Sequence, residues 1–287
     1  DPGIADLSWN ILDKNSFFLN TTVDRLWMDV TINKLQARIG RQRINWGQAL
    51  VWNPNDIFNA YSYFDFDYVE RPGSDAVRLQ YYLKASSVLE LAAKGDAEGN
   101  VTAAALYRFN KWGYDIQFMG GVLQNDELTI GTGWSGAFGA TSFRGEGTWF
   151  QPFKNSGDNE GTGMLTMGLD RIFGDNSTAQ VQLMLCNKPF NPGNFGSLYT
   201  KIMSVKSLAF SKFSAFGSYT YPLTPLFNLG LSVMWFPDLK GYFSGLSADY
   251  SLAENVDFSF LWQHFLGTFG NRKTMMNILF IRYKISF

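Results

Sequence analysis

The most constraining feature of this sequence is an alternation of apolar and polar residues that recurs along most of the chain. In the last segment, polar Arg282, Lys284 and Ser286 alternate with an apolar set made of Leu279, Ile281, Tyr283, Ile285 and Phe287. The same pattern appears in residues 26–32, 114–122, 180–185, 227–235 and 256–263. A period of two residues indicates β-strands whose two faces meet different environments.

The alternating segments are long for strands. Most cover about 9–11 residues, the length with which a tilted strand crosses a bilayer, whereas strands of soluble proteins usually have about 5–6 residues. We predict about sixteen strands, with fourteen or eighteen as alternatives. They span residues 5–12, 22–32, 35–45, 76–83, 87–94, 101–109, 114–123, 128–136, 140–149, 163–173, 177–186, 206–219, 226–236, 241–250, 255–265 and 274–287.

The links between these segments alternate between short and long. Short links such as residues 33–34 and 84–86 contrast with the long links 46–75, 150–162 and 187–205. Membrane barrels combine short periplasmic turns, longer external loops and an even strand count. A strand-built span must also close into a barrel, because hydrocarbon leaves every backbone N–H and C=O to be paired within the protein. The sequence therefore predicts an all-β fold, a single antiparallel up-and-down transmembrane barrel over residues 1–287 with both termini periplasmic.

Composition excludes several other classes. The net charge of -1 lacks the basic excess of nucleic-acid-binding proteins. One cysteine and one histidine, Cys186 and His264, leave little for metal binding or acid–base catalysis. The longest uncharged window, residues 213–237, contains Pro222 and Pro225, so two strands fit it better than a membrane helix. We expect no enzyme activity, cofactor or metal.

One long link differs from all the others. Residues 46–75 carry acidic side chains and many aromatic ones, and arginines frame the segment on both sides. Exposed to water, these aromatic side chains would form a large apolar patch. We therefore expect this loop to fold into the barrel, with its aromatic side chains packed as a plug core or, alternatively, lining a path for sugar rings.

Two stretches resemble known outer-membrane proteins. Residues 278–287, which end in Phe287, look like the closing strand of such barrels. The run RIGRQRINWG at residues 38–47, followed by NPND at 53–56 and RPGSDA at 71–76, is similar to porin-like families that include alginate-exporter-like barrels. The resemblance implies a porin-like protein of the Gram-negative outer membrane with a charged lumen.

These inferences predict a channel for small hydrophilic solutes in the outer membrane, surrounded by lipid and restricted by the loop 46–75. The residues expected to line or constrict the pore are Arg38, Arg41, Arg43, Asp56, Asp65, Asp67, Arg71, Arg78 and Arg108. Arg38, Arg78 and Arg108 would form a positive wall, with the loop aspartates opposite. The alternative is a non-conducting barrel that serves as a structural or docking component of an outer-membrane assembly. Either function allows a homo-oligomer or a protein partner.

Overall fold

We describe the protein from a computed structural model. The structure describes residues 3–14, 17–61, 63–64, 73–153, 160–191, 193 and 204–286. These residues form seventeen strands and two short 3-10 helices, η1 (Val205–Leu208) and η2 (Pro237–Leu239). Among them, no helix is long and apolar enough to cross a membrane.

The strands follow one another as an antiparallel meander, which confirms the predicted all-β fold. They are β1 (Ser8–Lys14), β2 (Phe17–Thr22), β3 (Leu26–Ile32), β4 (Leu35–Gln42), β5 (Ser74–Lys84), β6 (Ser87–Gly95), β7 (Val101–Lys111), β8 (Tyr114–Leu123), β9 (Glu127–Phe138), β10 (Thr141–Pro152), β11 (Thr162–Ile172), β12 (Thr178–Cys186), β13 (Phe213–Thr224), β14 (Phe227–Phe236), β15 (Gly241–Ala253), β16 (Val256–Phe269) and β17 (Arg272–Ile285).

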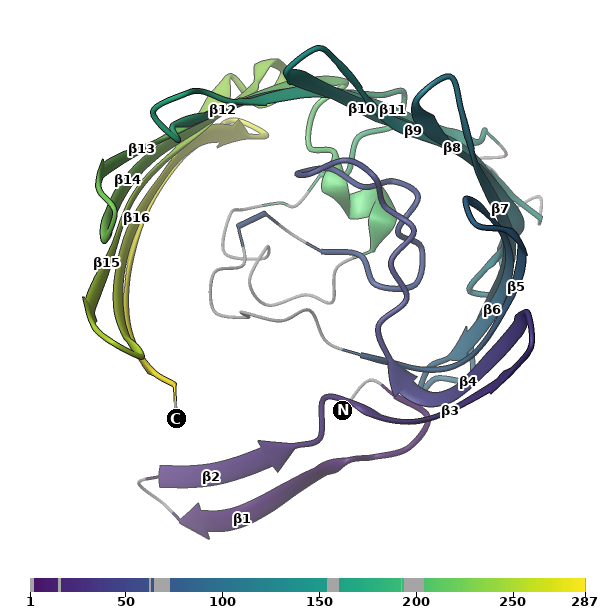
Figure 1. The fold of residues 1–287 in the computed structure, drawn as a ribbon. Coiled ribbons are helices and arrows are strands. Elements are labelled where there is room, and N and C mark those ends of the chain that lie inside the picture. Colours follow the sequence, from purple (N-terminus) through teal and green to yellow (C-terminus); the bar gives the residue numbers. More distant parts are fainter. Residues whose placement is uncertain are drawn as a thin grey trace.

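Strands β3 to β17 form one 15-stranded sheet in sequence order. Figure 1 shows this sheet curling round into a barrel wall that encloses the segment directly after β4. Strands β1 and β2 form a separate hairpin beside β3, near the opening between β3 and β17. In the described part of the chain, no ladder joins β3 to β17.

The described residues contain seventeen strands instead of the predicted sixteen or so. We predicted one strand over residues 22–32, but the chain forms β2 before it and starts β3 only at Leu26. The break falls at Val23, Asp24 and Arg25: the N–H of Val23 still bonds to the carbonyl of Leu7 next to β1, and pairing with β4 begins only at Leu26. The adjacent Phe17 and Phe18 also interrupt the alternation on which the prediction rested.

The two ends of the barrel differ, and we call them the loop rim and the turn rim. The loop rim carries the long links that follow β4, β10 and β12, whereas short turns such as residues 33–34 and 112–113 lie at the turn rim. Ala5 bonds to Asp75 at the loop-rim end of β5, and Ser286 bonds to Asn255 at the turn rim. The prediction that both ends of the chain share one side is therefore wrong for the described residues.

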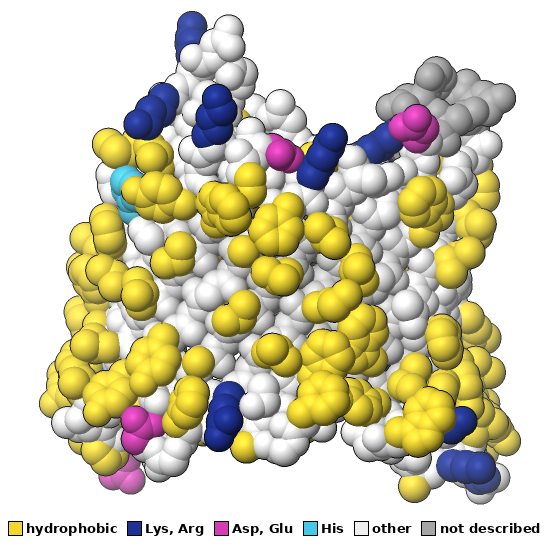
Figure 2. Space-filling model, turned by 90° about the horizontal axis from the view of Figure 1, so that it is seen from above, with side chains coloured by type: hydrophobic (Ala, Val, Ile, Leu, Met, Phe, Trp, Pro, Cys, Tyr) yellow, Lys and Arg dark blue, Asp and Glu magenta, His cyan; other side chains and the backbone are white. Residues whose placement is uncertain are grey.

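The outer surface is apolar, as the alternation predicted. Along β14, Leu229, Leu231 and Val233 point outward and are exposed, while Ser232 and Met234 point inward and are buried. Figure 2 shows apolar side chains covering the middle of one side of the barrel, with charged side chains gathered at the two rims. A water-soluble protein would bury such a belt, so this surface fits a lipid environment.

Candidate functional site

The candidate site is the segment that follows β4 and lies inside the barrel. We call residues 43–61 and 63–64 the inserted loop. It has no regular secondary structure, yet Ile44, Trp46 and Phe58 are 0–1% exposed. Because these residues lie away from bulk water, their backbone N–H and C=O groups need partners within the protein. The inward side chains of the strands supply many of them.

Glu146 on β10 is the central anchor. Its fully buried carboxylate accepts hydrogen bonds from the backbone N–H groups of Gln48, Ala49 (2.6 Å) and Asn55 (2.9 Å). The Asn55 amide donates to the carbonyl of Thr132 at 3.0 Å and accepts from the hydroxyl of Thr148 at 2.7 Å. These three backbone N–H bonds to one buried side chain fix the tip of the loop against β9 and β10.

The loop can approach this wall closely because Gly131 and Gly133 lie beneath it on β9. A Cβ atom at Gly131 would lie 2.4 Å from Oδ1 of Asn55, and one at Gly133 would lie 2.8 Å from Oε1 of Gln48. A larger residue at either position would displace the amide side chains of Asn55 or Gln48 from β9. The glycines are therefore part of the anchor.

Two glutamines hold the loop on either side of Glu146. Gln182 on β12 accepts from the N–H of Val51 at 2.9 Å and donates to the carbonyl of Trp52 at 3.1 Å. Gln117 on β8 donates to the carbonyl of Trp46 at 2.6 Å. Both glutamine side chains are buried, and both use the loop backbone as their partner.

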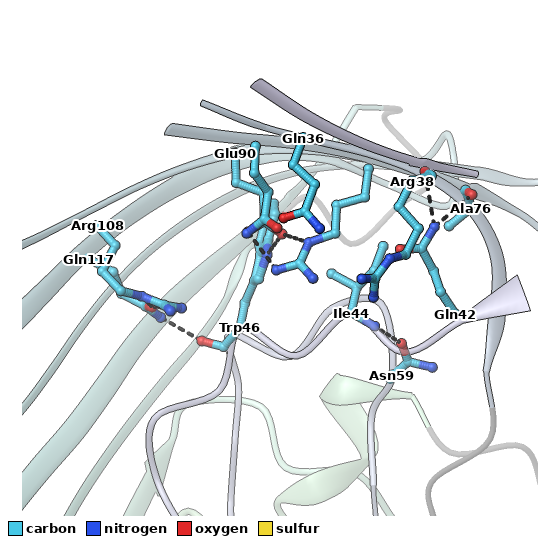
Figure 3. Close-up of polar contacts among 12 residues, drawn as sticks. Gln36, Arg38, Gln42, Ile44, Trp46, Asn59, Ala76, Glu90, Arg108 and Gln117 are labelled. Carbon is cyan, nitrogen blue, oxygen red and sulfur yellow. Dashed lines mark hydrogen bonds and ion pairs between the residues drawn. The ribbon is translucent and has the colours of Figure 1, made fainter. Parts of the chain in front are cut away.

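A second carboxylate, Glu90 on β6, binds the loop through a side chain. It accepts from the indole N–H of Trp46 at 2.6 Å, from Arg78 at 2.7 and 2.8 Å, and from Gln80 at 2.9 Å. Figure 3 shows this group beside the Gln117 contact. The Arg78–Glu90 pair is bidentate, a geometry that fixes both partners.

The loop is tied to the loop rim at Ile44 and at Phe58–Asn59. Asn59 accepts from the N–H of Ile44 at 3.0 Å and donates to the Ser74 hydroxyl at 3.0 Å. Lys94 donates to the carbonyl of Phe58. Beside this point Arg41 forms a bidentate pair with Asp75 at 2.8 and 3.1 Å. The loop therefore enters the lumen at a fixed position.

Aromatic packing carries the loop across to the opposite wall. The ring of Phe64 lies 5.1 Å from the rings of Phe243 and Phe265, on β15 and β16. Tyr63 packs 4.9 Å from Phe216 on β13. Burial raises the pKa of the Tyr63 hydroxyl above its ordinary value, so it stays protonated. The inserted loop thus contacts the inner wall on both sides of the barrel.

A second segment also enters the barrel. We predicted a strand from residue 206, but residues 205–208 form η1 and the strand β13 starts only at Phe213. Val205, Leu208 and Phe210 are buried, and the Phe210 ring stacks on Phe64 at 6.0 Å. Figure 1 shows η1 inside the ring of strands.

Three predicted arginines line the inner wall with partly exposed heads. Arg38 pairs with Asp29 at 2.8 Å and Arg78 pairs with Glu90 at 2.7 Å; their side chains are 26% and 20% exposed. Arg38 and Arg78 are direct cross-strand partners. Arg108 on β7 bonds to Gln117 at 3.0 Å, and no carboxylate pairs with it among the described residues. Its charge is therefore not neutralised in this part of the structure.

The other predicted residues occupy different environments. Arg41 is buried in its pair with Asp75, and Arg43 is half-buried. Asp56 is 1% exposed and so lies away from lumen water. Asp65, Asp67 and Arg71 lie outside the described residues.

The sequence interpretation missed the anchoring role of Glu146, Gln117 and Gln182, although a glutamate between Gly145 and Gly147 at an inward strand position was a usable signal.

Neither a catalytic nor a metal site emerges from these residues. His264 faces outward on β16 and bonds to Asn277 at 2.8 Å and to the Tyr242 hydroxyl at 3.4 Å, not to a serine. In the part of the chain that the structure describes, no three His, Cys, Asp or Glu side chains group to hold a metal ion.

Comparison with solved structures places this fold among outer-membrane porins. OccK11 (OpdR) of Pseudomonas aeruginosa aligns with a TM-score of 0.65 and 11% identity, over 93% of this chain and 83% of that one. The outer membrane protein OprD of the same organism gives 0.64 and 12%, over 93% and 80%. A BenF-like porin from Pseudomonas fluorescens Pf-5 gives 0.61 and 11%, over 92% and 78%.

The sequence itself matches no family model and no curated protein. At such low identity the structural matches establish the fold alone, which is that of the OprD and Occ porins. The link to alginate-exporter-like barrels finds no support among these structures.

Proposed function

We propose that this protein is an outer-membrane channel for small hydrophilic solutes, restricted by the inserted loop. The main observation behind this proposal is that the outer surface of the barrel is apolar, whereas its inner wall is polar and holds the loop at mid-height. The fold shared with OprD and the Occ proteins supports this proposal. We place the turn rim, and with it the C-terminal end of β17, on the periplasmic side, because short turns are periplasmic in such barrels.

Exposure along the inner wall indicates which part of the lumen water reaches. Near the turn rim the inward side chains of Arg38, Arg78 and Arg144 remain partly exposed. At the level of the anchors, Gln117 and Glu146 are fully buried. The described residues thus leave a water-accessible vestibule on the turn-rim side and a narrow zone where the loop lies.

The burial of the anchors also favours the second candidate, a non-conducting barrel in which the loop is a permanent plug. Such a protein would serve as a structural or docking component of an assembly. Conductance separates the two functions, because a permanent plug passes no ions.

Replacing residues 53–70 with a short Gly/Ser linker is expected to raise the single-channel conductance in planar bilayers. The change removes the aromatic contacts of Phe58, Tyr63 and Phe64 while the strands keep their ladders. A silent wild-type protein with a conducting variant would indicate a plug that opens only with a partner. Silence from both would contradict the channel proposal.

Arg108 is expected to favour anions in the vestibule. Replacing it with glutamine should lower the chloride-to-potassium permeability ratio by roughly fivefold, the effect of about 1 kcal/mol for one charge in a wet environment. The reversal potential in a KCl gradient measures this ratio. Lys240→Gln at the loop rim is the matched control, since Lys240 is exposed and lies outside the vestibule. An unchanged ratio would show that Arg108 does not face the ion path.

A further inference from the structure

The outer wall contains a groove that neither the channel nor the loop uses. It has a volume of about 600 Å³ and lies on the side formed by β8–β12, the side that Figure 2 shows. Its walls are apolar side chains that point toward lipid: Phe118, Ile130, Trp149, Leu165 and Leu185. Most of the outer belt carries large side chains, so a depression here needs a local cause.

The cause is glycine on the outward face of β10 and β11. A Cβ atom at Gly163 would lie 2.9 Å from the Trp149 ring, so this indole lies flat over the backbone of β11. At Gly147 the nearest atom to a Cβ would be Leu165 Cδ1 at 3.5 Å, an ordinary van der Waals distance. Trp134 covers the neighbouring Gly145. Gly147 is therefore open to the outside and forms the floor of the groove.

The groove has one cationic end. Lys212 lines it at the loop rim, immediately before β13. Its backbone is fixed, because its N–H donates to Asp238 at 2.6 Å and its carbonyl accepts from the N–H of Cys186 at 2.9 Å. The Lys212 ammonium forms no ion pair with any residue that the structure describes, whereas the nearby Lys188 is paired with Glu160.

We propose that this groove binds one acyl chain of an anionic lipid, with the lipid headgroup against Lys212. The apolar walls run from the loop rim toward mid-height on β8–β12, as a chain anchored at its headgroup would. A cation near a membrane surface attracts anionic lipid by about 1 kcal/mol, and Trp149 is suited to the interface between headgroups and acyl chains. The inference rests on the membrane location of the proposed channel.

The test is native mass spectrometry of the full chain, purified in detergent and supplied with phosphatidylglycerol or with phosphatidylcholine of the same acyl chains. Wild-type protein is expected to retain phosphatidylglycerol preferentially. Gly147→Leu, which fills the groove floor, should lower retention of both lipids. Lys212→Gln should lower only the preference for phosphatidylglycerol, by about fivefold. Lys273→Gln, an exposed lysine at the same rim on β17, should change neither.

Three outcomes would overturn the inference. Retention in wild type that does not differ between the two lipids would remove the role of Lys212. Equal retention in wild type and Gly147→Leu would remove the groove. A wild-type oligomer that Gly147→Leu dissociates would assign the groove to a second copy of the chain.

If Gly147→Leu does not fold, Lys212→Glu is the variant that tests the inference, because it should reverse the preference for phosphatidylglycerol. Conductance should be unchanged in every variant, so loss of lipid binding and failure of the channel proposal are separate results.

Discussion

Replacing Glu146 with alanine is expected to release the inserted loop and raise the single-channel conductance. The carboxylate accepts three backbone N–H groups, those of Gln48, Ala49 and Asn55, and alanine leaves all three without this acceptor. A buried donor without a partner costs about 1–3 kcal/mol. For three donors this gives about 3–9 kcal/mol. We expect the free energy of unfolding to fall by an amount near the lower end, about 3 kcal/mol, because lumen water reaches the donors once the loop moves.

Bilayer recording and a denaturant titration in lipid vesicles measure the two effects of this change. Glu146→Gln keeps one acceptor oxygen and should lie between wild type and alanine in both measurements. Glu254→Ala, in the exposed turn between β15 and β16, is the control for loss of a carboxylate elsewhere. An alanine variant with wild-type conductance and stability would show that the loop is held without Glu146.

Replacing Leu231 with arginine is expected to lower the free energy of unfolding in lipid vesicles by about 2–4 kcal/mol, the cost of a cation at the middle of the bilayer. Leu231 lies in the middle of β14, is 49% exposed, and has Tyr219 and Leu246 as outward cross-strand neighbours. Its side chain therefore faces lipid if the belt is a membrane surface.

The depth dependence makes this test specific. Leu226→Arg, in the exposed turn before β14, should cost only about 0–1 kcal/mol because it lies near the interface. Leu231→Ala separates the loss of the leucine side chain from the gain of a charge. Equal costs for arginine at positions 231 and 226 would contradict the membrane assignment.

The strands and their outward faces could be predicted because each depends on residues close in sequence. Alternation along residues 227–235 is local, and the structure places its apolar residues outward. The prediction failed where the local pattern was interrupted, at Phe17–Phe18 and in residues 205–212. There, tertiary contacts decide the structure, as the burial of Val205 and Phe210 inside the barrel shows.

The anchors of the loop could not be predicted for the opposite reason. Gln48 and Glu146 are 98 residues apart, and Val51 and Gln182 are 131 residues apart. Only the curvature of the whole sheet brings these groups together. The aromatic richness of the loop indicated that it was buried, but gave no information on which wall would bind it. Arg41, expected at the constriction, instead pairs with Asp75 across neighbouring strands.

The way the wall holds the loop has a consequence for how such a protein can change in evolution. Glu146, Gln117 and Gln182 all bind main-chain groups of the loop, which every residue type except proline provides alike. Exposed side chains of the loop, such as that of Leu50, can therefore be exchanged without loss of these bonds. The barrel thus keeps one fixed cradle while the residues presented to a passing solute diverge, so new selectivity can arise without a new scaffold.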